Sequence, residues 1–284
     1  MNGAFVAIAL SVLMHVSWNL LARHVDTRCN YLWWGLLAHL VLLGPWSLWH
    51  LIADSRWNTE LVIAMLISAA ANALYFSALR KAYHFAPVAL VYPVARSSPV
   101  LIAIWTLLLF NQGISMGAAV GIGINAIGLW ILAASSRHGD TRHAIPWAIV
   151  AALATSVYSL SDKTAVVYLP TFGSQLGFIT VGYLASFLAL TISQYRELKS
   201  MTPHHRPKLV YILIGGCFIG TAYALVVRAM LQLPAAYVVA YTNAGIVLAT
   251  VLSIWVFKET DNRLSRLFAS CVITIGLIVL GIFR

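Results

Sequence analysis

The chain has 284 residues, of which 61% are hydrophobic and only 9% are charged. A soluble domain carries about a quarter charged residues, and because burial saturates as domains grow, a soluble fold of this length could not hide so much apolar surface. The excess of 18 Lys and Arg over 8 Asp and Glu does not indicate nucleic-acid binding, because these charges lie mostly at the ends of apolar runs, where they contact lipid headgroups.

Ten apolar runs follow one another along the chain. They approach the roughly 20 residues that cross a hydrocarbon core as a helix, and they lack the two-residue alternation of β-barrel strands. We therefore predict an all-α membrane protein with ten transmembrane helices, multi-pass in the cell inner (plasma) membrane. The predicted spans are residues 4–22, 31–51, 61–79, 88–110, 115–135, 145–167, 174–194, 208–231, 235–257 and 265–283.

The first span begins almost at the N-terminus. No basic region precedes it, and it contains His15, Trp18 and Asn19, so we expect a retained helix and not a cleaved signal peptide. The three cysteines are far apart and form no Cys-x-x-Cys pair, so the sequence indicates neither a disulfide framework nor a metal site. No cofactor is expected.

An internal repeat relates the two halves of the chain. Shifted by 140 residues, residues 15–23 meet residues 155–163, and shifted by 147, Arg96 meets Asn243. Five spans in each half is an odd number, which places the halves in opposite orientations, as in many secondary transporters whose site lies near the midplane between repeats. The predicted inverted five-helix repeats are residues 1–137 and 145–284.

Each half has a polar and aromatic stripe on one face of its first helix, by i, i+3 and i+4 spacing. In chain order the stripes are Ser11, His15, Trp18, Asn19 and Ala22 in the first half, and Thr155, Tyr158, Ser159 and Asp162 in the second. Polar groups inside a span are costly, so by default they mark a functional site. The stripes could line one cavity, or they could only hold neighbouring helices together by hydrogen bonds.

The fourth span carries an arginine well inside its apolar zone. Arg96 is the ninth residue of the run 88–110 and shares a face with Tyr92, while Ser97 follows it directly. An arginine in a cavity can hold a carboxylate, phosphate or phosphonate by two parallel hydrogen bonds. The alternatives are that Arg96 reaches to the membrane interface or pairs permanently with Asp162.

Several tyrosines lie deeper than the tryptophans, most of which cluster near span ends in the usual interfacial belt. These are candidates for a binding pocket, and packing in the core with the hydroxyl bonded to a neighbour is about as good an interpretation. They are Tyr75, Tyr158, Tyr183, Tyr223 and Tyr241.

A coupling proton would need a titratable group within a span, and Asp162 or His15 could serve. Asp162 stands beside Lys163, and we interpret the two as an interfacial ion pair. Coupling therefore stays open, and a facilitator without a coupling ion is allowed.

Three short motifs carry a resemblance to a known family: Ala-Pro-Val-Ala-Leu from Ala86, Tyr-Pro-Val-Ala-Arg-Ser-Ser-Pro from Tyr92, and Phe-Lys-Glu-Thr from Phe257. With ten spans in two halves, the chain resembles the EamA-type branch of the drug/metabolite transporter superfamily. His-Val-Ser-Trp-Asn, from His15, and Tyr-Pro-Val-Ala-Arg, from Tyr92, also resemble a branch linked with phosphonate use. One departure is Asn111-Gln112-Gly113, where the family often has Gly-Glu, so that the acid is kept only at Glu259.

The resemblance implies alternating-access transport, often outward, of amino acids, nucleotide sugars or related metabolites through a cavity lined by helices 1, 3, 4, 6, 8 and 9. We therefore expect an efflux transporter of a small anionic or zwitterionic solute, monomeric or homodimeric, in contact with lipid. A scaffold or sensor is the alternative, and it is less favoured because such a protein would usually bring a soluble output domain. A lipid-modifying enzyme is less favoured, because Gly113-Ile-Ser-Met-Gly117 lacks the strand-turn-helix context of a nucleophile elbow.

Basic residues also predict an orientation. Connections after odd-numbered spans hold most of the lysines and arginines, among them Arg80, Lys81 and Arg142. The positive-inside rule would place these connections in the cytoplasm and both termini outside, whereas members of the resembled family are commonly drawn with both termini inside.

Overall fold

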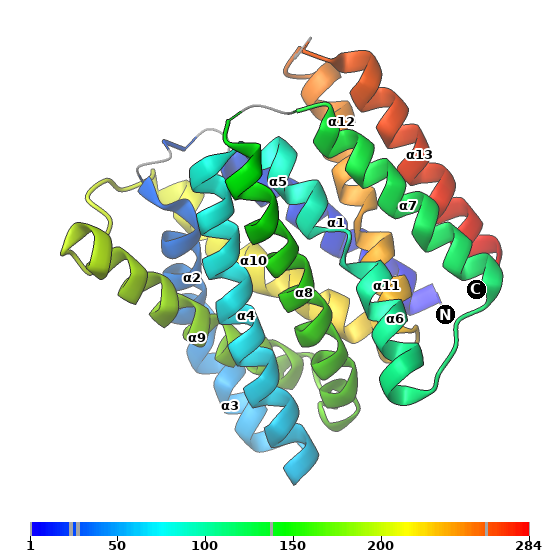
Figure 1. Ribbon diagram of the computed structural model, residues 1–284. Helices are drawn as coiled ribbons and strands as arrows, with labels where there is room; N and C mark the ends of the chain where they lie inside the picture. Colours follow the sequence, from blue (N-terminus) through cyan, green and yellow to red (C-terminus); the bar gives the residue numbers. More distant parts are fainter. Residues whose placement is uncertain (1, 23–24, 27–28, 137–138, 259–260, 284) are drawn as a thin grey trace. The chain divides into compact units, whose positions relative to one another are not determined.

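The computed structural model describes residues 2–22, 25, 26, 29–136, 139–258 and 261–283, and within them the chain is helical with short connections and no strand. Arg23 and Glu259, both used in the sequence comparison, lie outside these residues. The helices are α1 (Asn2–Ala22), α2 (Tyr31–Leu42), α3 (Gly44–Asp54), α4 (Thr59–Phe85), α5 (Val88–Ala95), α6 (Ser98–Phe110), α7 (Met116–Ala134), α8 (Thr141–Ala165), the short 3₁₀ helix η2 (Val166–Tyr168), α9 (Phe172–Leu198), α10 (Leu209–Ala229), α11 (Ala235–Thr242), α12 (Ala244–Trp255) and α13 (Arg263–Ile282) (Figure 1).

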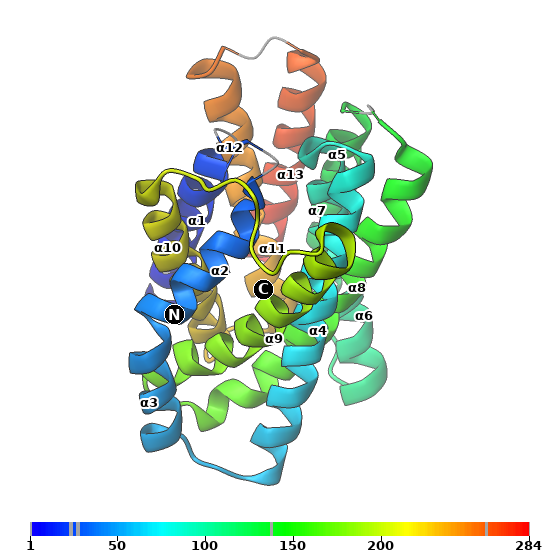
Figure 2. The same cartoon turned by 90° about the vertical axis from the view of Figure 1, so that its left-hand side faces the viewer.

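Among the described residues, nine helical segments are long and apolar enough to cross a membrane, and the bent pair α2–α3 makes ten if it counts as one span. The chain is therefore a multi-pass membrane protein by length and composition, and each of the ten predicted runs corresponds to one segment or pair. The bend of 58° between α2 and α3 is visible in Figure 2. Pro45 lies in the first turn of α3, where it has no N–H to continue the ladder of α2.

The fourth and ninth runs are also interrupted, each at its ninth residue. α5 gives way to α6 at Arg96, where φ is −83° and ψ is 0°, and Pro99, in the first turn of α6, cannot donate to the carbonyl four residues before it. α11 gives way to α12 at Asn243, whose backbone N–H donates to the carbonyl oxygen of Ala240 at 2.9 Å in a tightened turn. The two breaks fall at the positions that the shift of 147 residues aligns.

The helices form two compact units. Unit 1 comprises residues 1–77 and 161–232, and unit 2 comprises residues 78–160 and 233–284, so the chain passes from one unit to the other inside α4 and α8. Each unit takes helices from both predicted halves. The units are thus groups of packed helices and not the repeats themselves, and the inverted arrangement of the halves stays a prediction.

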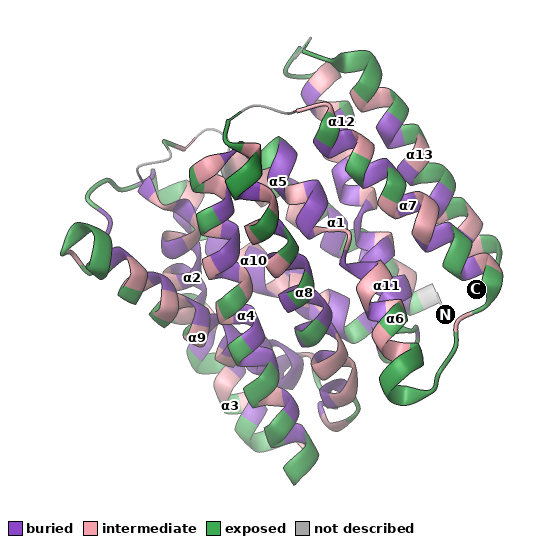
Figure 3. Cartoon of the chain, in the orientation of Figure 1, coloured by how far each residue is buried: buried purple, intermediate pink, exposed green. Residues whose placement is uncertain are grey.

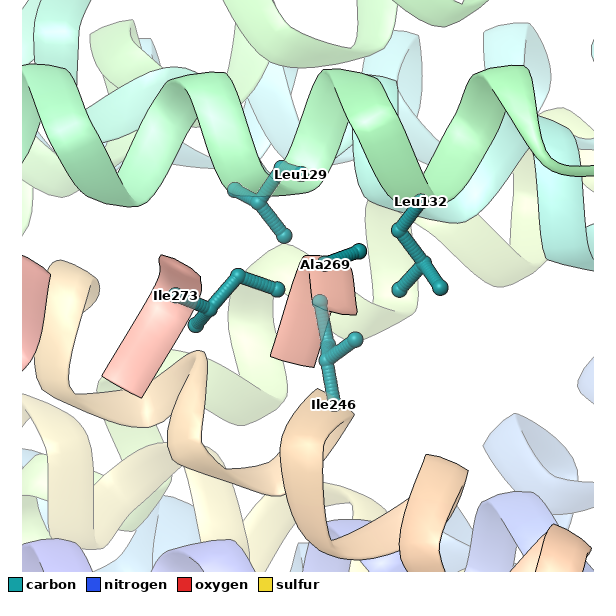
Figure 4. Packing of buried hydrophobic residues seen from close by; sticks show 5 residues of the cluster. All are labelled: Leu129, Leu132, Ile246, Ala269 and Ile273. Atoms are coloured by element: carbon teal, nitrogen blue, oxygen red, sulfur yellow. The ribbon is translucent and has the colours of Figure 1, made fainter. Parts of the chain in front are cut away.

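In unit 2, α7 and α13 run side by side (Figure 1). A Cβ on Gly121 would lie 2.6 Å from the backbone nitrogen of Leu280, and one on Gly276 would lie 2.4 Å from that of Asn125. Such contacts leave no room for a side chain, and small residues are what allow helix backbones to approach closely in lipid. Beside this contact lies an apolar cluster, shown in Figure 4, of Leu129, Leu132, Ile246, Ala269 and Ile273.

In unit 1, glycines of α10 form a notch for a histidine of α2. The imidazole of His39 is fully buried, and a Cβ on Gly220 would lie 2.1 Å from its Cε1 atom. Its Nε2 lies 3.0 Å from Thr180 Oγ1 and its Nδ1 3.3 Å from the carbonyl oxygen of Gly216. A neutral imidazole protonated on Nδ1 satisfies both contacts, so His39 is a packing residue that joins three helices.

Exposed residues occur along the helices (Figure 3), and many of them are large and apolar. On α6 they include Leu107, Leu108 and Leu109, with exposed fractions of 53%, 67% and 69%. Contiguous exposed apolar surface is rare on soluble monomers, and it is what lipid requires of a helix that crosses it.

The connection between α7 and α8 shows how the second predicted repeat begins. Gly139 has φ of +79°, and a Cβ there would lie 2.5 Å from the carbonyl oxygen of Phe85, so only glycine fits. Asp140 then caps α8, because its carboxylate accepts from the backbone N–H of His143 at 3.3 Å and lies 2.7 Å from that residue's Nδ1. The contact with the His143 side chain holds the pKa of Asp140 below its ordinary value.

Three of the basic residues lie elsewhere than predicted. Arg80 and Lys81 belong to α4, which continues to Phe85, and Arg142 lies in the first turn of α8, so the expectation that they lie in connecting loops is wrong. α4 continues beyond the end of the apolar run, because lysine and arginine are good helix formers. The helix itself ends shortly before Pro87, which disfavours helical geometry in the residue preceding it. Lys81 Nζ lies 4.2 Å from the centroid of the Trp147 ring.

Candidate functional site

The break between α5 and α6 presents the guanidinium group of Arg96 to the break between α11 and α12. Arg96 Nε donates to Asn243 Oδ1 at 3.1 Å, and Nη2 donates to the hydroxyl of Thr242. In return, Asn243 Nδ2 donates to the carbonyl oxygen of Arg96 at 3.3 Å. The two residues that the internal repeat aligns therefore contact each other directly, near the middle of their spans.

Within the described part of the chain, the side chains that accept hydrogen bonds from Arg96 are neutral. Among the described residues no carboxylate forms an ion pair with it, and the ring centroid of Tyr92 lies 6.0 Å from its Cζ. A guanidinium has five N–H donors, and the adjacent residues Thr242 and Asn243 accept from two of them. A half-buried cation with three donors left and no countercharge is costly inside a membrane span, and an anionic ligand would relieve this cost.

A second amide extends the arrangement onto α7. Asn243 Nδ2 also donates to Asn125 Oδ1 at 2.8 Å, and Asn125 and Asn243 are both buried. The Asn125 Nδ2 atom is buried and has no hydrogen-bond partner among the described residues. Because an unsatisfied buried polar group costs free energy, this donor also favours an acceptor from outside the protein.

The remaining predicted site residues of unit 2 differ in their surroundings. Ser97 donates its hydroxyl to the carbonyl oxygen of Val94 at 2.7 Å, which closes the turn at the break. Tyr158 is buried, and the buried Ser159 hydroxyl has no partner among the described residues. The hydroxyl of Tyr241 lies 3.5 Å from where a Cβ on Gly281 would be, so this tyrosine lies against α13.

In unit 1, Asp162 joins three helices. Its carboxyl group is fully buried. Ser68 Oγ on α4 donates to Oδ1 at 2.5 Å, and the hydroxyl of Tyr223 on α10 donates to Oδ2 at 2.5 Å. Asn72 Nδ2 in turn lies 3.0 Å from the carbonyl oxygen of Ser68 and 3.4 Å from its Oγ.

The interpretation of Asp162 and Lys163 as an interfacial ion pair is wrong. The Lys163 ammonium donates to the backbone carbonyl of Met230, and Asp162 forms no ion pair among the described residues. Successive residues of a helix point about 100° apart, so the two side chains of this dipeptide leave α8 in different directions. Arg96 belongs to unit 2 and Asp162 to unit 1.

The polar stripe of α1 is bonded largely to its own helix. His15 Nδ1 lies 3.0 Å from the carbonyl oxygen of Ser11, and Asn19 Nδ2 donates to the carbonyl oxygen of His15 at 2.7 Å. The ring centroids of His15 and Trp18 lie 6.4 Å apart. The indole N–H of Trp18 is buried with no partner among the described residues. Tyr75, on α4, packs edge-on against Phe76 with 5.1 Å between centroids.

The structure thus joins some of the predicted site residues and leaves others apart. In unit 2 it joins Arg96 with Asn243, and in unit 1 it joins Asp162 with Tyr223. The stripe of α1 and the pair Tyr158–Ser159 fall in different units, so their meeting in one cavity stays a prediction.

Sequence reasoning missed four polar residues of these clusters, namely Ser68, Asn72, Asn125 and Thr242. Ser68 and Asn72 are spaced i, i+4 inside an apolar run, the same pattern that marked the stripe of α1. Asn125 interrupts a run that is otherwise apolar or small. These patterns could have identified Ser68, Asn72 and Asn125. Among the described residues, no three His, Cys, Asp or Glu side chains gather as ligands for a metal ion.

Comparison with known proteins places the fold and no more. No protein-family profile matches the sequence, and no curated protein matches it. Among solved structures, 29 chains match. One of them, described only as the crystal structure of a protein, has a TM-score of 0.71 at 18% sequence identity and covers 100% of this chain and 99% of its own. The chain therefore has a fold that is already known among solved structures.

Proposed function

We propose that this protein is a secondary transporter of the EamA type, in the drug/metabolite transporter superfamily. It moves a small organic solute that is anionic or zwitterionic, as an exporter in the cell inner membrane, by alternating access. The motifs at Ala86, Tyr92 and Phe257 support the family, and the 18% identical structure supports the fold alone.

The main support for the proposal is that the charged side chain of Arg96 lies inside a span and is bonded to neutral groups. A guanidinium nine residues into a span, with neutral partners and no carboxylate among the described residues, has a strong requirement for a negative charge. A protein that needed Arg96 only to join helices could use a neutral amide at lower cost, as it does at Asn125 and Asn243. The cost of keeping the cation is explained if a solute carboxylate, phosphate or phosphonate binds it.

The helix breaks support the same location. Two short helical segments interrupted at corresponding positions of two halves are the best sequence-level pointer to a transporter's binding site, because interrupted helices leave backbone groups free to bind a solute. Here the breaks at Arg96 and Asn243 are such a pair, and the hydroxyl of Ser98 in the first turn of α6 is buried without a partner among the described residues.

The proposal is tested by thermal unfolding of the purified protein with amino acids, phosphonates, sugar phosphates and nucleosides. A ligand at 100 times its dissociation constant stabilises the folded state by about 2.7 kcal/mol. We expect an anionic or zwitterionic compound to raise the melting temperature, and Arg96→Ala to abolish this shift. Arg228→Ala, which removes an exposed arginine of α10, should retain it, and so controls for the loss of one positive charge.

A transport assay in proteoliposomes with the compound found in this way completes the test. Wild type and Arg228→Ala should take it up, and Arg96→Ala should not. A compound that binds through Arg96 without being transported would favour a sensor, whereas transport that persists in Arg96→Ala with unchanged affinity would remove the arginine from the site.

A further inference from the structure

Asp162 has an environment that suits two protonation states. Its carboxyl group is fully buried in unit 1, where an unpaired negative charge is expensive. Its partners are hydroxyl groups, from Ser68 and Tyr223. A hydroxyl both donates and accepts, so it can donate to a carboxylate and, after rotation, accept from a carboxylic acid. A lysine or arginine partner would hold the acid in its charged form alone.

The groups around Asp162 allow its carboxyl group to be either protonated or ionised. From α4, Ser68 bonds the carboxyl group and Asn72 bonds Ser68, and neither of these side chains titrates. From α10 the partner is Tyr223. Lys163, the next residue of α8, bonds the carbonyl of Met230. On α9, a Cβ on Gly182 would lie 3.3 Å from Asn72 Nδ2, and the hydroxyl of Tyr183 donates to the carbonyl oxygen of Ile219 at 3.2 Å. Among the described residues, no cation forms an ion pair with the carboxyl group.

We propose that Asp162 is a proton-binding site, with Ser68 and Tyr223 as its two hydrogen-bond partners, and that its protonation is coupled to solute movement. Binding transfers a proton from a hydronium ion of the aqueous phase to one carboxylate oxygen, and a water molecule is released. The new O–H donates to the hydroxyl of Ser68 or Tyr223, and that hydroxyl turns its own proton to another acceptor. Because these groups lie on α4, α8 and α10, each protonation event changes the attraction between three helices.

The proton site stands on the geometry of unit 1, and its coupling to solute rests on the proposed transport function. The site is therefore tested first without any solute. Infrared difference spectra of the purified protein, recorded as the pH is stepped, report the carbonyl band of protonated carboxylic acids. We expect a band that titrates in the wild type and is absent in Asp162→Asn. Asp140→Asn, an exposed helix cap, should keep the band, and Tyr223→Phe should move its midpoint.

The outcome without solute decides the site. A band unchanged in Asp162→Asn overturns the proposal, whether or not the protein transports anything. Stabilisation by Na⁺ that depends on Asp162 at constant pH overturns it too, in favour of a metal cation. A band that is lost in Asp162→Asn establishes the proton site even if no transported solute is found, in which case the proposed function alone fails.

Coupling is tested in proteoliposomes with a pH indicator inside. Addition of a transported solute should drive a proton flux in the wild type and in Asp140→Asn, and the flux should fall by about tenfold or more in Asp162→Asn. Passive exchange of labelled solute across the membrane should survive in that variant, which shows that it folds. Solute movement without proton flux in the wild type would overturn the coupling while leaving the transport function intact.

Discussion

Arg96 and Asp162 are two ionisable residues inside spans, and their partners differ in what they permit. The guanidinium of Arg96 donates to Asn243 and Thr242. A guanidinium does not lose its proton in proteins, so unit 2 contains a fixed positive charge. Ser68 and Tyr223 can bond either form of a carboxyl group, so unit 1 contains a charge that can be switched. The first arrangement suits binding of an anion, and the second suits binding of a proton.

Asn243→Asp tests the fixed charge at the residue scale. The change is nearly isosteric and would place a carboxylate about where an oxygen now lies 3.1 Å from Arg96 Nε, so that Arg96 gains an internal counterion. We expect affinity for the anionic solute to fall by about tenfold or more, roughly 1.4 kcal/mol. Some stability should be lost as well, because the carboxylate cannot replace the Nδ2 donor to the Arg96 carbonyl oxygen and to Asn125 Oδ1. Calorimetric titration of the purified variant measures the affinity.

Asn243→Ala is the matched control for that variant, because it removes the amide without adding charge. It should weaken binding less than Asn243→Asp does. Equal losses in the two variants would mean that the amide positions Arg96 and that charge neutralisation is not the cause.

At the scale of elements, helix contacts are set by small residues. α7 meets α13 through Gly121 and Gly276, and α10 meets α2 through the notch that receives His39. Association of helices in lipid gains nothing from hydrophobic burial and depends on close packing. These glycines therefore contribute to stability through the space that they leave.

Gly121→Ala should destabilise the protein, and Gly123→Ala on the same helix should not. The first Cβ would lie 2.6 Å from the Leu280 backbone nitrogen, whereas the second would have nothing within 4 Å. We expect Gly121→Ala to cost about 1–3 kcal/mol, as overpacking does, and Gly123→Ala to be neutral or to stabilise by roughly 0.5–1 kcal/mol. Thermal unfolding in detergent compares them, and an equal effect of both substitutions would contradict the close contact.

At the scale of the whole molecule, the number of spans depends on the bent pair α2–α3. If the pair crosses the membrane as one span, there are ten spans and the two termini lie on the same side. The connection after α7 then lies on the opposite side, as two inverted repeats of five spans require. If the pair enters and returns, both relations reverse.

Labelling with a membrane-impermeant maleimide distinguishes the two topologies. The three native cysteines are replaced by serine, and single cysteines are introduced as Asn2→Cys, Ser136→Cys or Phe283→Cys. We expect positions 2 and 283 to label from one side and position 136 from the other. Labelling of positions 2 and 136 from the same side would exclude ten spans, and with them the inverted repeat.

Amino-acid composition and the order of residues along the chain were enough to indicate that the helices lie in lipid and to locate the spans. Hydropathy is summed over about 20 consecutive residues, so it needs no knowledge of tertiary contacts, and all ten runs appear as helices. The same local reasoning located Arg96 deep in a span and aligned it with Asn243, because a repeat is a property of sequence order.

Only the tertiary structure decided which polar groups meet. Asp162 stands next to Lys163 in sequence, yet it bonds Ser68, which is 94 residues away, and Arg96 bonds Asn243 across 147 residues. A buried polar group takes the partner that helix packing brings within hydrogen-bonding distance, and that choice depends on glycine contacts and helix breaks far along the chain. Hydropathy averaged over a window does not detect such breaks, which is why the interruptions at Arg96, at Asn243 and between α2 and α3 became visible only in the folded chain.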